Sequence, residues 1–296
     1  MAQNLEPHHQ KSRPELIPDE FLASAPPQPL KIKHIDFASS PLPENAECLA
    51  LTIDNILSKA ECDQLVSLAE ASVSNIKEDE TPWKPATINI GQGIQATVRD
   101  YRHCHRIEWD QQSIVDRIWD RCAQAPGLRE LLAEVVPEGS FEGEKWDFRR
   151  FNQRMRFLRY EPGQFFKPHC DNPIWYKDKR AEFQTHYTAM LYLSDSTTER
   201  GGTEPLKGGV TSFLSQDRER RVDVNPRAGS VLIFQQRGLL HEGTVVEKGV
   251  KYVIRMDMVY EWVEGGEVAN KRVRMIGEVD GVAQTDEAPV LTFPKT

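Results

Sequence analysis

From residue 154 onward, the sequence consists of short runs of β-forming residues separated by glycines, prolines and charged turns. The runs are 154–160, 187–193, 210–214, 230–235 and 251–260. Short strands at this spacing are typical of a β-sandwich or a jelly roll. The sequence has no internal repeat of fixed period and no glycine-rich strand-to-helix loop of the dinucleotide-binding kind. The second half of the chain therefore predicts a sandwich or jelly-roll core.

Helical patterns come before this region. Ser58-Lys59-Ala60-Glu61 matches a capping box at the start of a helix, and a candidate strand at 49–56 precedes it. Apolar residues recur every third or fourth position over about 111–123 and 127–135, which predicts two more helices. We therefore expect an α+β protein with an N-terminal helical layer over about 55–140 and a β core over about 150–262.

The two ends of the chain differ from the middle. Residues 1–45 contain 8 of the 19 prolines and little periodic apolar pattern, so we expect a tail or an extended lead-in whose end packs on the core. We place one domain at 46–265 and a C-terminal extension at 266–296. A chain of 296 residues would by length alone allow one large domain or two small ones.

Composition excludes several partners. The chain has 37 Lys and Arg against 45 Asp and Glu, a net charge of −8, and no basic block, so nucleic acid is not an expected partner. No run approaches the roughly 20 apolar residues of a spanning helix, and the first thirty residues do not resemble a secretory leader. The five cysteines are widely spaced without a CxxC, which favours a reducing, cytoplasmic setting.

One short motif suggests a metal site. In Phe165-Phe-Lys-Pro-His169-Cys-Asp171, the histidine and the aspartate are two residues apart and share one face if the segment is extended. His241 follows 72 residues later, after a β-rich stretch that can fold it back beside them. Two imidazoles and one carboxylate suit a non-haem Fe(II) site with open positions. A His and an Asp at this spacing alone are a weak signal, because such pairs often occur on surfaces.

The flanking residues strengthen the signal. Arg159-Tyr-Glu-Pro-Gly-Gln-Phe-Phe-Lys-Pro-His169-Cys-Asp171 resembles the Tyr-x-x-Gly-x-x-Phe-x-x-His-x-Asp segment of the prolyl 4-hydroxylase-like group of Fe(II)/2-oxoglutarate dioxygenases. Gly208-Gly-Val-Thr-Ser-Phe213 is similar to that group's GGxTxF strand, and 241–251 keeps its His, Gly, Val, Gly and Lys spacing. Residues 57–65 resemble the helix that opens the catalytic domain. The resemblance covers about 48–262.

The resemblance implies a double-stranded β-helix, or jelly-roll, core that binds Fe(II) through His169, Asp171 and His241 as the catalytic ligands. It also implies 2-oxoglutarate and O2 as cosubstrates, with ascorbate a candidate reductant. Lys251, ten residues after the distal histidine, would pair with the far carboxylate of 2-oxoglutarate, and Tyr160 would hydrogen-bond it. A dianion bound in a β core needs such a cation, because a buried unpaired carboxylate costs several kcal/mol.

Arg255 is an alternative partner for the cosubstrate. It lies four residues after Lys251, on the same face of the same expected strand. Other dioxygenase groups use an arginine at about this distance from the distal histidine. An ion pair with Asp257 is the simpler structural role for Arg255. We favour Lys251 for the cosubstrate because its spacing matches the group, and keep Arg255 second.

Four residues are candidates for contact with substrate. Arg154 and Arg156 share strand parity with Tyr160, so they face the core with it, and would bind an anionic substrate or form a salt-bridge network at the rim. Trp175 and Tyr176 follow the metal motif and would line the mouth or seal a loop. The segment 195–207 is longer than the group's usual turn, which favours a lid and a departure from prolyl specificity.

These inferences predict a 2-oxoglutarate-dependent dioxygenase that hydroxylates an aliphatic C–H bond and releases succinate and CO2. Desaturation stays open, whereas Asp171 argues against halogenation, since related halogenases have a small residue there. The insert and the arginine pair favour a small molecule or secondary metabolite as substrate. A peptidyl or protein prolyl hydroxylase and a catalytically silent metal-binding β-helix module are the alternatives.

Overall fold

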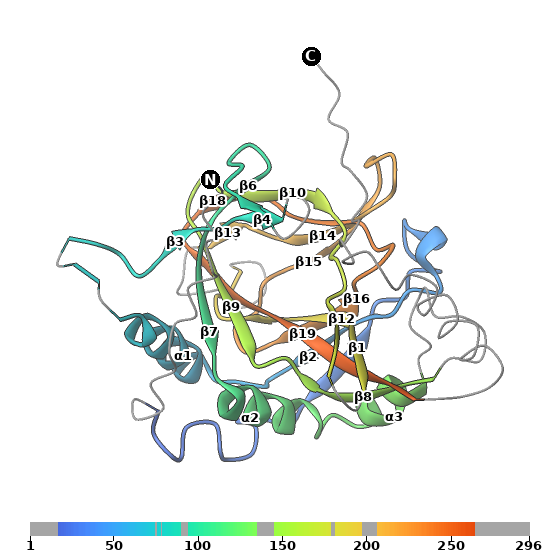
Figure 1. Ribbon diagram of the computed structural model, residues 1–296. Helices are drawn as coiled ribbons and strands as arrows, with labels where there is room; N and C mark the ends of the chain where they lie inside the picture. The colour runs from blue at the N-terminus through green and yellow to red at the C-terminus, as the bar shows by residue number, and fades with distance from the viewer. Residues whose placement is uncertain are drawn as a thin grey trace, which may run out of the picture.

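The computed structural model describes residues 17–263, with gaps at 75, 78, 90–93, 135–144, 179–180 and 197–205. The expected C-terminal extension, the first part of the lead-in and most of the 195–207 insert lie outside the described residues. The helices are α1 (Lys59–Ser72), α2 (Gln112–Cys122), α3 (Leu128–Glu134) and a 3-10 turn at Pro43–Asn45 (Figure 1). The strands are β1 (Lys31–His34), β2 (Ala50–Asp54), β3 (Lys84–Pro85), β4 (Ile88–Asn89), β5 (Gln95–Ala96), β6 (Arg102–His103), β7 (His105–Asp110), β8 (Lys145–Phe151), β9 (Arg154–Tyr160), β10 (Phe165–His169), β11 (Trp175–Lys177), β12 (Glu182–Tyr192), β13 (Lys207–Gly208), β14 (Thr211–Leu214), β15 (Arg221–Val224), β16 (Val231–Gln235), β17 (His241–Gly243), β18 (Val246–Lys248) and β19 (Lys251–Val263).

Two antiparallel sheets form the core. The larger runs in the order β1-β2-β16-β12-β19-β9-β7-β3, and the smaller in the order β15-β14-β17-β10-β6. From β9 onward the chain crosses repeatedly between them: β9, β12, β16 and β19 belong to the larger sheet, and β10, β14 and β17 to the smaller. Two facing sheets joined by such crossings are a jelly roll. The jelly-roll core expected from the sequence is therefore confirmed, within a chain that is mostly β-sheet with few helices.

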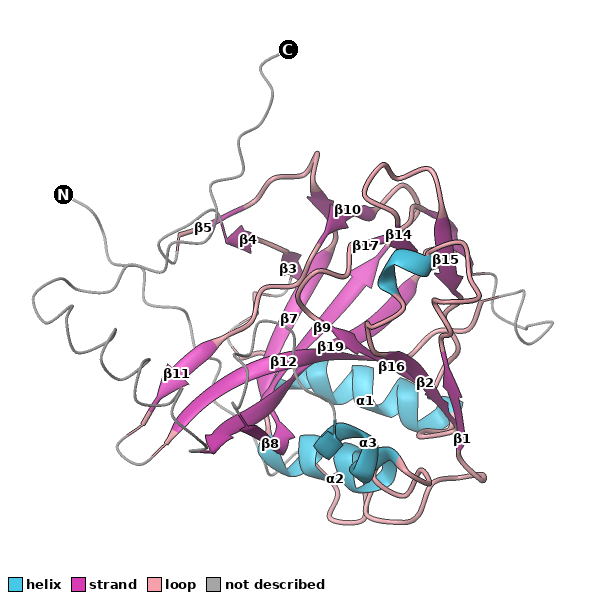
Figure 2. Ribbon diagram, turned by 90° about the vertical axis from the view of Figure 1, so that its right-hand side faces the viewer, coloured by secondary structure: helices cyan, strands magenta, loops and turns pink. Residues whose placement is uncertain are grey.

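The helices lie on the outer face of the larger sheet, opposite the smaller sheet (Figure 2). Their apolar side chains share one buried cluster with alternate residues of the sheet, including Leu65, Ile118 and Leu128 beside Ile254 and Met256. None of the described helices is long and apolar enough to cross a lipid bilayer. Helix α1 begins with the expected capping box, since Ser58 and Glu61 hydrogen-bond reciprocally.

The segment before β8 is less helical than expected. Residues 84–110 contain β3 to β7 between α1 and α2, so the expected helical layer of 55–140 is in part a strand region. Strand β7 pairs with β9 over its whole length and extends the larger sheet. Its alternation of Ile107 and Trp109 with charged residues is the usual pattern of a half-buried strand.

Part of the proline-rich lead-in packs against the core. Phe21, Leu22 and Phe37 are buried. The guanidinium of Arg121, itself buried, donates hydrogen bonds to the carbonyl of Ser24 at 3.0 Å and that of Ile56 at 3.0 Å. These contacts attach the lead-in to α2 and the start of α1.

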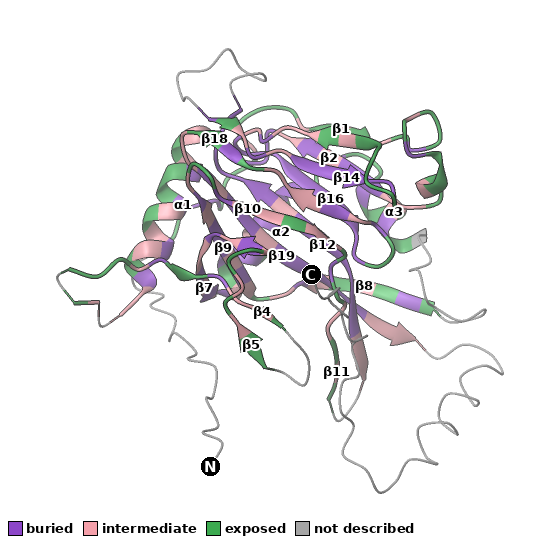
Figure 3. Cartoon of the chain, turned by 90° about the horizontal axis from the view of Figure 1, so that it is seen from above, coloured by how far each residue is buried: buried purple, intermediate pink, exposed green. Residues whose placement is uncertain are grey.

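A second apolar cluster fills the interior between the two sheets, and the buried polar residues Asp171, His241 and Lys251 lie among its strands. Tyr160, Tyr192, Phe213, Phe234 and Val253 belong to it. The central strands of the larger sheet are buried along most of their length (Figure 3). Because side chains alternate along a strand, the same strands supply one row to this interior and one to the helices.

Strand β13 pairs closely with the backbone of β18. Gly208 pairs with Val246 of β18 and has a φ of +75°. A Cβ atom at Gly208 would lie 2.3 Å from the carbonyl oxygen of Val245. Only glycine combines this backbone angle with this approach.

We predict that Gly208→Ala lowers the free energy of unfolding by roughly 2–4 kcal/mol, because it adds a backbone clash to the strain of a positive φ. Denaturant unfolding followed by circular dichroism measures the change. Gly163→Ala is the matched control, since Gly163 has a φ of +84° but nothing within 4 Å of its Cβ position. A control loss as large as that of Gly208→Ala would contradict the steric argument.

Candidate metal centre and its surroundings

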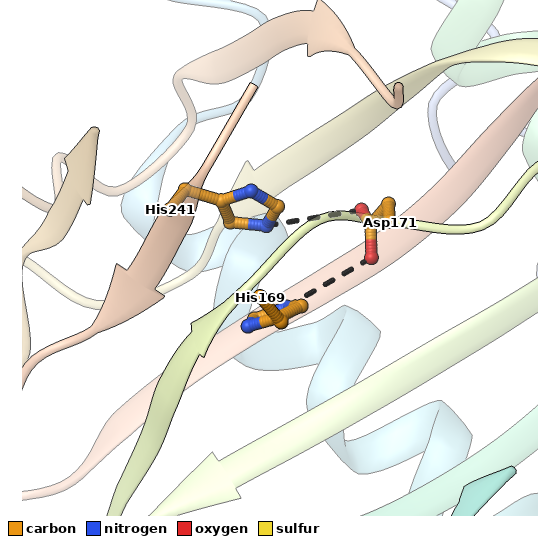
Figure 4. A group of neighbouring side chains, drawn as sticks. All are labelled: His169, Asp171 and His241. Carbon is orange, nitrogen blue, oxygen red and sulfur yellow. Dashed lines mark ion pairs between the residues drawn. The ribbon is translucent and has the colours of Figure 1, made fainter. Parts of the chain in front are cut away.

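The fold brings the three expected ligands together. Strands β10 and β17 are neighbours in the smaller sheet, and His169 and His241 are register partners. Asp171 follows just beyond β10. One donor atom from each of the three residues lies within 4.8 Å of the others. Figure 4 shows both imidazoles turned toward the carboxylate, which lies on the chain leaving β10.

Each histidine is oriented by its own backbone. Nδ1 of His169 lies 2.8 Å from the carbonyl oxygen of Lys167, and Nδ1 of His241 lies 3.0 Å from that of Leu239. A carbonyl only accepts, so each Nδ1 carries the proton and each Nε2 keeps its lone pair. Phe166 stacks on His169 at 3.6 Å between ring centroids, and Phe234 meets His241 edge-on at 4.7 Å. Both Nε2 atoms are therefore directed inward as donors for a metal.

Asp171 is held through one of its two oxygens. Its Oδ2 accepts hydrogen bonds from Thr188 Oγ1 at 2.6 Å and Arg255 Nε at 3.1 Å. Its Oδ1 lies 3.9 Å from His169 Nε2. Oδ2 lies 4.0 Å from His241 Nε2, but it already accepts two hydrogen bonds, so Oδ1 keeps more of its lone pairs for a cation.

The protonation states suit a metal. Burial lowers the pKa of His169 to about 3 and lowers that of His241 as well, so both imidazoles are neutral at pH 7. Burial alone would raise the pKa of Asp171, but Arg255 and the two histidines outweigh it and bring the net value well below its usual range. Two neutral imidazoles and one carboxylate are the donor set of a non-haem ferrous site. The residues present fit the ion that the sequence motif implies.

Lys251 is buried on the interior side of β19, where it pairs in register with Tyr160 of β9. Its Nζ lies 5.5 Å from the ring centroid of Tyr160 and 5.6 Å from that of Tyr192. No carboxylate of the described residues forms an ion pair with it. Burial lowers the pKa of Lys251 to about 7. The lysine is thus a buried cation that an anionic ligand would stabilise.

Arg255 is already engaged by two carboxylates. Besides Asp171, it contacts Asp257, whose Oδ1 lies 3.0 Å from its Nη2. Fully buried Asp257 also accepts from Arg156 Nη1 at 2.6 Å and from Gln236 Nε2 at 3.0 Å. The pair with Asp257, the simpler role considered for Arg255, is present, and the contact with Asp171 adds to it. Arg255 therefore lies in a polar network that supports the metal ligand.

The four candidate substrate residues lie in different settings. Arg154 forms a two-pronged pair with Asp110 at 2.8 Å for both contacts, and Arg156 binds Asp257. The two arginines thus belong to ion pairs, as the salt-bridge alternative expects. In β11, Trp175 is 43% exposed, while Tyr176 stacks on Phe183 at 5.1 Å.

Two supporting residues escaped the sequence analysis. Thr188 binds Asp171, and buried Gln236 bridges Asp257 and Thr185, accepting from Thr185 Oγ1 at 2.9 Å. The parity of β12 would have placed Thr188 on the interior face, beside Tyr192, but a lone threonine in a strand carries no chemical signal of its own. Gln236 lies just past the end of β16, where parity is not a guide.

Comparison with known proteins supports the motif analysis. Residues 155–256 match the family model described as the 2OG-Fe(II) oxygenase superfamily. The resemblance to the Fe(II)/2-oxoglutarate dioxygenases is confirmed. The matched segment contains all three expected metal ligands together with Tyr160 and Lys251. Fe(II), 2-oxoglutarate and O2 are accordingly the cofactors and cosubstrates that this family implies.

Curated relatives are prolyl hydroxylases at low identity. The chain is 25% identical over 195 residues to the probable prolyl 4-hydroxylase 3 of Arabidopsis thaliana, covering 62% of this chain and 57% of the relative. It is 26% identical over 219 residues to probable prolyl 4-hydroxylase 8 of the same plant, covering 69% of this chain and 66% of the relative. The chain thus spans less than two thirds of the length of these relatives.

The comparison with solved structures finds a viral collagen prolyl hydroxylase from Paramecium Bursaria Chlorella virus-1, at 21% identity and a TM-score of 0.42. That match covers 71% of this chain and 95% of the other. A Pseudomonas putida prolyl-4-hydroxylase matches at 17% identity and a TM-score of 0.45, covering 75% of this chain and 97% of the other.

We predict that His169→Ala and His241→Ala each weaken Fe(II) binding by more than about 100-fold, because each removes one of three ligands. Anaerobic calorimetry with Fe(II) measures the affinity. His103→Ala, in the neighbouring strand β6, is the control and should bind Fe(II) like the wild type. Retained Fe(II) affinity in both ligand variants would contradict the assignment.

Proposed function

We propose that this protein is an Fe(II)- and 2-oxoglutarate-dependent hydroxylase. The observation that carries the proposal is the convergence of His169, Asp171 and His241, which place one donor atom each within 4.8 Å of the others. The proposed catalytic domain runs over 46–265. When bound, iron and 2-oxoglutarate supply the oxidising chemistry: O2 is consumed, 2-oxoglutarate yields succinate and CO2, and one oxygen atom enters a substrate C–H bond.

The protein's own residues then act through geometry and charge. We propose His169, Asp171 and His241 as the metal ligands, with Thr188 and Arg255 holding Asp171 in place. Lys251 is the proposed partner of the far carboxylate of 2-oxoglutarate, with Tyr160 beside it. Lys251 forms no ion pair with a carboxylate of the described residues, whereas Arg255 forms two, so Lys251 is favoured for this role. The surrounding aromatic cluster excludes water from the site.

A prolyl residue of a peptide is the proposed substrate, because the curated relatives are described as prolyl 4-hydroxylases. The small-molecule expectation loses its main support, since Arg154 and Arg156 already pair with carboxylates and are not free for an anionic metabolite. The exposed indole of Trp175, four residues after Asp171, offers the kind of aromatic surface on which proline rings pack. The silent-module alternative has no use for a buried cation at Lys251.

We predict that the affinity for 2-oxoglutarate falls as the pH rises above about 7. The ammonium form of Lys251 binds the carboxylate, and with a pKa of about 7 in the free protein its charged fraction falls about tenfold per pH unit above that value. Below pH 6 the lysine is fully charged and the affinity no longer changes through this group. Calorimetric titration of the metal-loaded protein at pH 6 to 8.5 measures the curve.

Lys251→Met is the control for this curve. It removes the charge at similar volume, so its affinity should be weaker and independent of pH, with iron binding retained. A variant with unchanged affinity for 2-oxoglutarate would shift the role to Arg255.

We predict that the iron-loaded protein hydroxylates proline-containing peptides. A peptide library incubated with Fe(II), 2-oxoglutarate, ascorbate and O2 should release succinate, and mass spectrometry should find a gain of one oxygen atom on proline. The same peptides with alanine in place of proline, and the His169→Ala variant, should show neither. Oxygen gain only in a parallel pool of small metabolites would overturn the peptide substrate and restore the small-molecule reading.

A further inference from the structure

A second buried cation without a carboxylate lies near Lys251. Arg102, in β6, is 9% exposed. Its Nε lies 3.4 Å from Cys104 Sγ, its Nη1 lies 3.4 Å from the carbonyl oxygen of Thr87, and its guanidinium carbon is 4.6 Å from the Phe166 ring centroid. No carboxylate of the described residues forms an ion pair with it.

This setting differs from that of the other interior arginines. Arg154 binds Asp110, Arg156 binds Asp257, and Arg255 binds Asp171 and Asp257. Ion pairs thus account for these three guanidinium groups. Among the described interior cations, Arg102 and Lys251 are left without an anion.

Strand register places the two cations on the same side of the metal ligands. Arg102 is the register partner of Phe166, which lies three residues before His169 on β10. The Phe166 ring stacks on His169 at 3.6 Å and contacts Arg102 at 4.6 Å, so the two partners use opposite faces of the ring. Lys251 is opposite Tyr160, which ends β9 just before the turn into β10.

Tyr160 links the two cations. Its ring contacts the Lys251 ammonium, and burial raises the pKa of its hydroxyl while the nearby Arg102 guanidinium acts in the opposite direction. Cys104, the thiol neighbour of Arg102, also influences the charge of Lys251. A guanidinium, a phenol and an ammonium therefore lie close together in the buried interior.

Burial opposes the charged form of Arg102, but its neighbours Cys104 and Tyr160 outweigh this and leave its pKa raised. Neither neighbour is a carboxylate, so the guanidinium can still form a charge-assisted hydrogen bond with an anionic ligand. A carboxylate has two oxygens and four lone-pair positions, so it can accept from an ammonium and from a guanidinium at once.

We propose that Arg102 binds the far carboxylate of 2-oxoglutarate together with Lys251. The inference rests on the proposed function. A carboxylate on the substrate is the less favoured ligand, because Phe166 lies between Arg102 and His169. The exposed side chain nearest in the chain to the metal motif is instead that of Trp175, four residues after Asp171, where we place the substrate.

The test compares two 2-oxo acids of equal chain length. Protein loaded with Fe(II) under anaerobic conditions is titrated with 2-oxoglutarate and with 2-oxopentanoate, which has a methyl group in place of the far carboxylate. Arg102→Gln should weaken 2-oxoglutarate binding by about 10- to 100-fold, the loss expected for one hydrogen bond to a charged group. Binding of 2-oxopentanoate should change by less than about threefold. Arg102→Lys, which keeps the charge, should lose less for 2-oxoglutarate than Arg102→Gln.

Arg227→Gln is the matched control, because Arg227 pairs with Asp54 and its loss removes the same charge without touching Arg102 or Lys251. Thermal unfolding of the Fe(II)-loaded protein supplies a readout independent of turnover: added 2-oxoglutarate should raise the melting temperature of the wild type more than that of Arg102→Gln. Wild-type binding of 2-oxoglutarate with no loss in Arg102→Gln, or with equal loss for both acids, would overturn the inference alone. A wild type that binds Fe(II) but not 2-oxoglutarate would overturn the proposed function as well.

Discussion

The register of β19 against β9 and β12 determines where the charges of the interior lie. Lys251, Arg255 and Asp257 share one face of β19, with Tyr160 opposite the first, Arg156 opposite the second and Thr188 opposite the third. Because side chains alternate with a period of two, a slip by one residue would turn all of them toward the helices. The apolar row on the other face, which includes Ile254 and Met256, holds the register by packing against those helices.

Charge balance in this interior divides into a closed part and an open part. Near the metal ligands, the guanidinium groups of Arg156 and Arg255 meet the carboxylates of Asp171 and Asp257, so the network is neutralised before any ligand arrives. These ion pairs hold the carboxylate of Asp171 in place, and they need no charged group from a substrate. Arg102 and Lys251, by contrast, form no ion pair with a carboxylate within the part of the chain that the structure describes. The asymmetry favours an anionic ligand beside these two cations.

The sequence predicted the local features of the site better than the contacts between distant segments. The strand Arg154–Tyr160, the capping box at Ser58 and the shared face of His169 and Asp171 followed from spacing and parity, which depend only on neighbours in the chain. His241, 72 residues after His169, was found through the family resemblance instead. The partners of Arg154 and Arg156 did not, because they come from β7 and β19, and parity states which face a residue takes but not which strand lies opposite. Arg102 escaped for the same reason, because its neighbours Phe166 and Tyr160 belong to other strands, and its own sequence context does not reveal them.

The glycine pair of the GGxTxF motif shows how two distant motifs form one steric unit. Gly208 lets β13 approach the backbone of β18, and Gly209, with a φ of +67°, is next in the chain. A Cβ atom on Gly209 would lie 3.0 Å from Val246 Cγ2 and 3.2 Å from Lys251 Cδ. A side chain at position 209 would therefore crowd the methylene groups of Lys251, which glycine leaves free. Gly208 and Gly209 thus leave room for the Lys251 side chain, and the strand that follows His241 brings this side chain to them. Together they place the Lys251 ammonium group between the rings of Tyr160 and Tyr192.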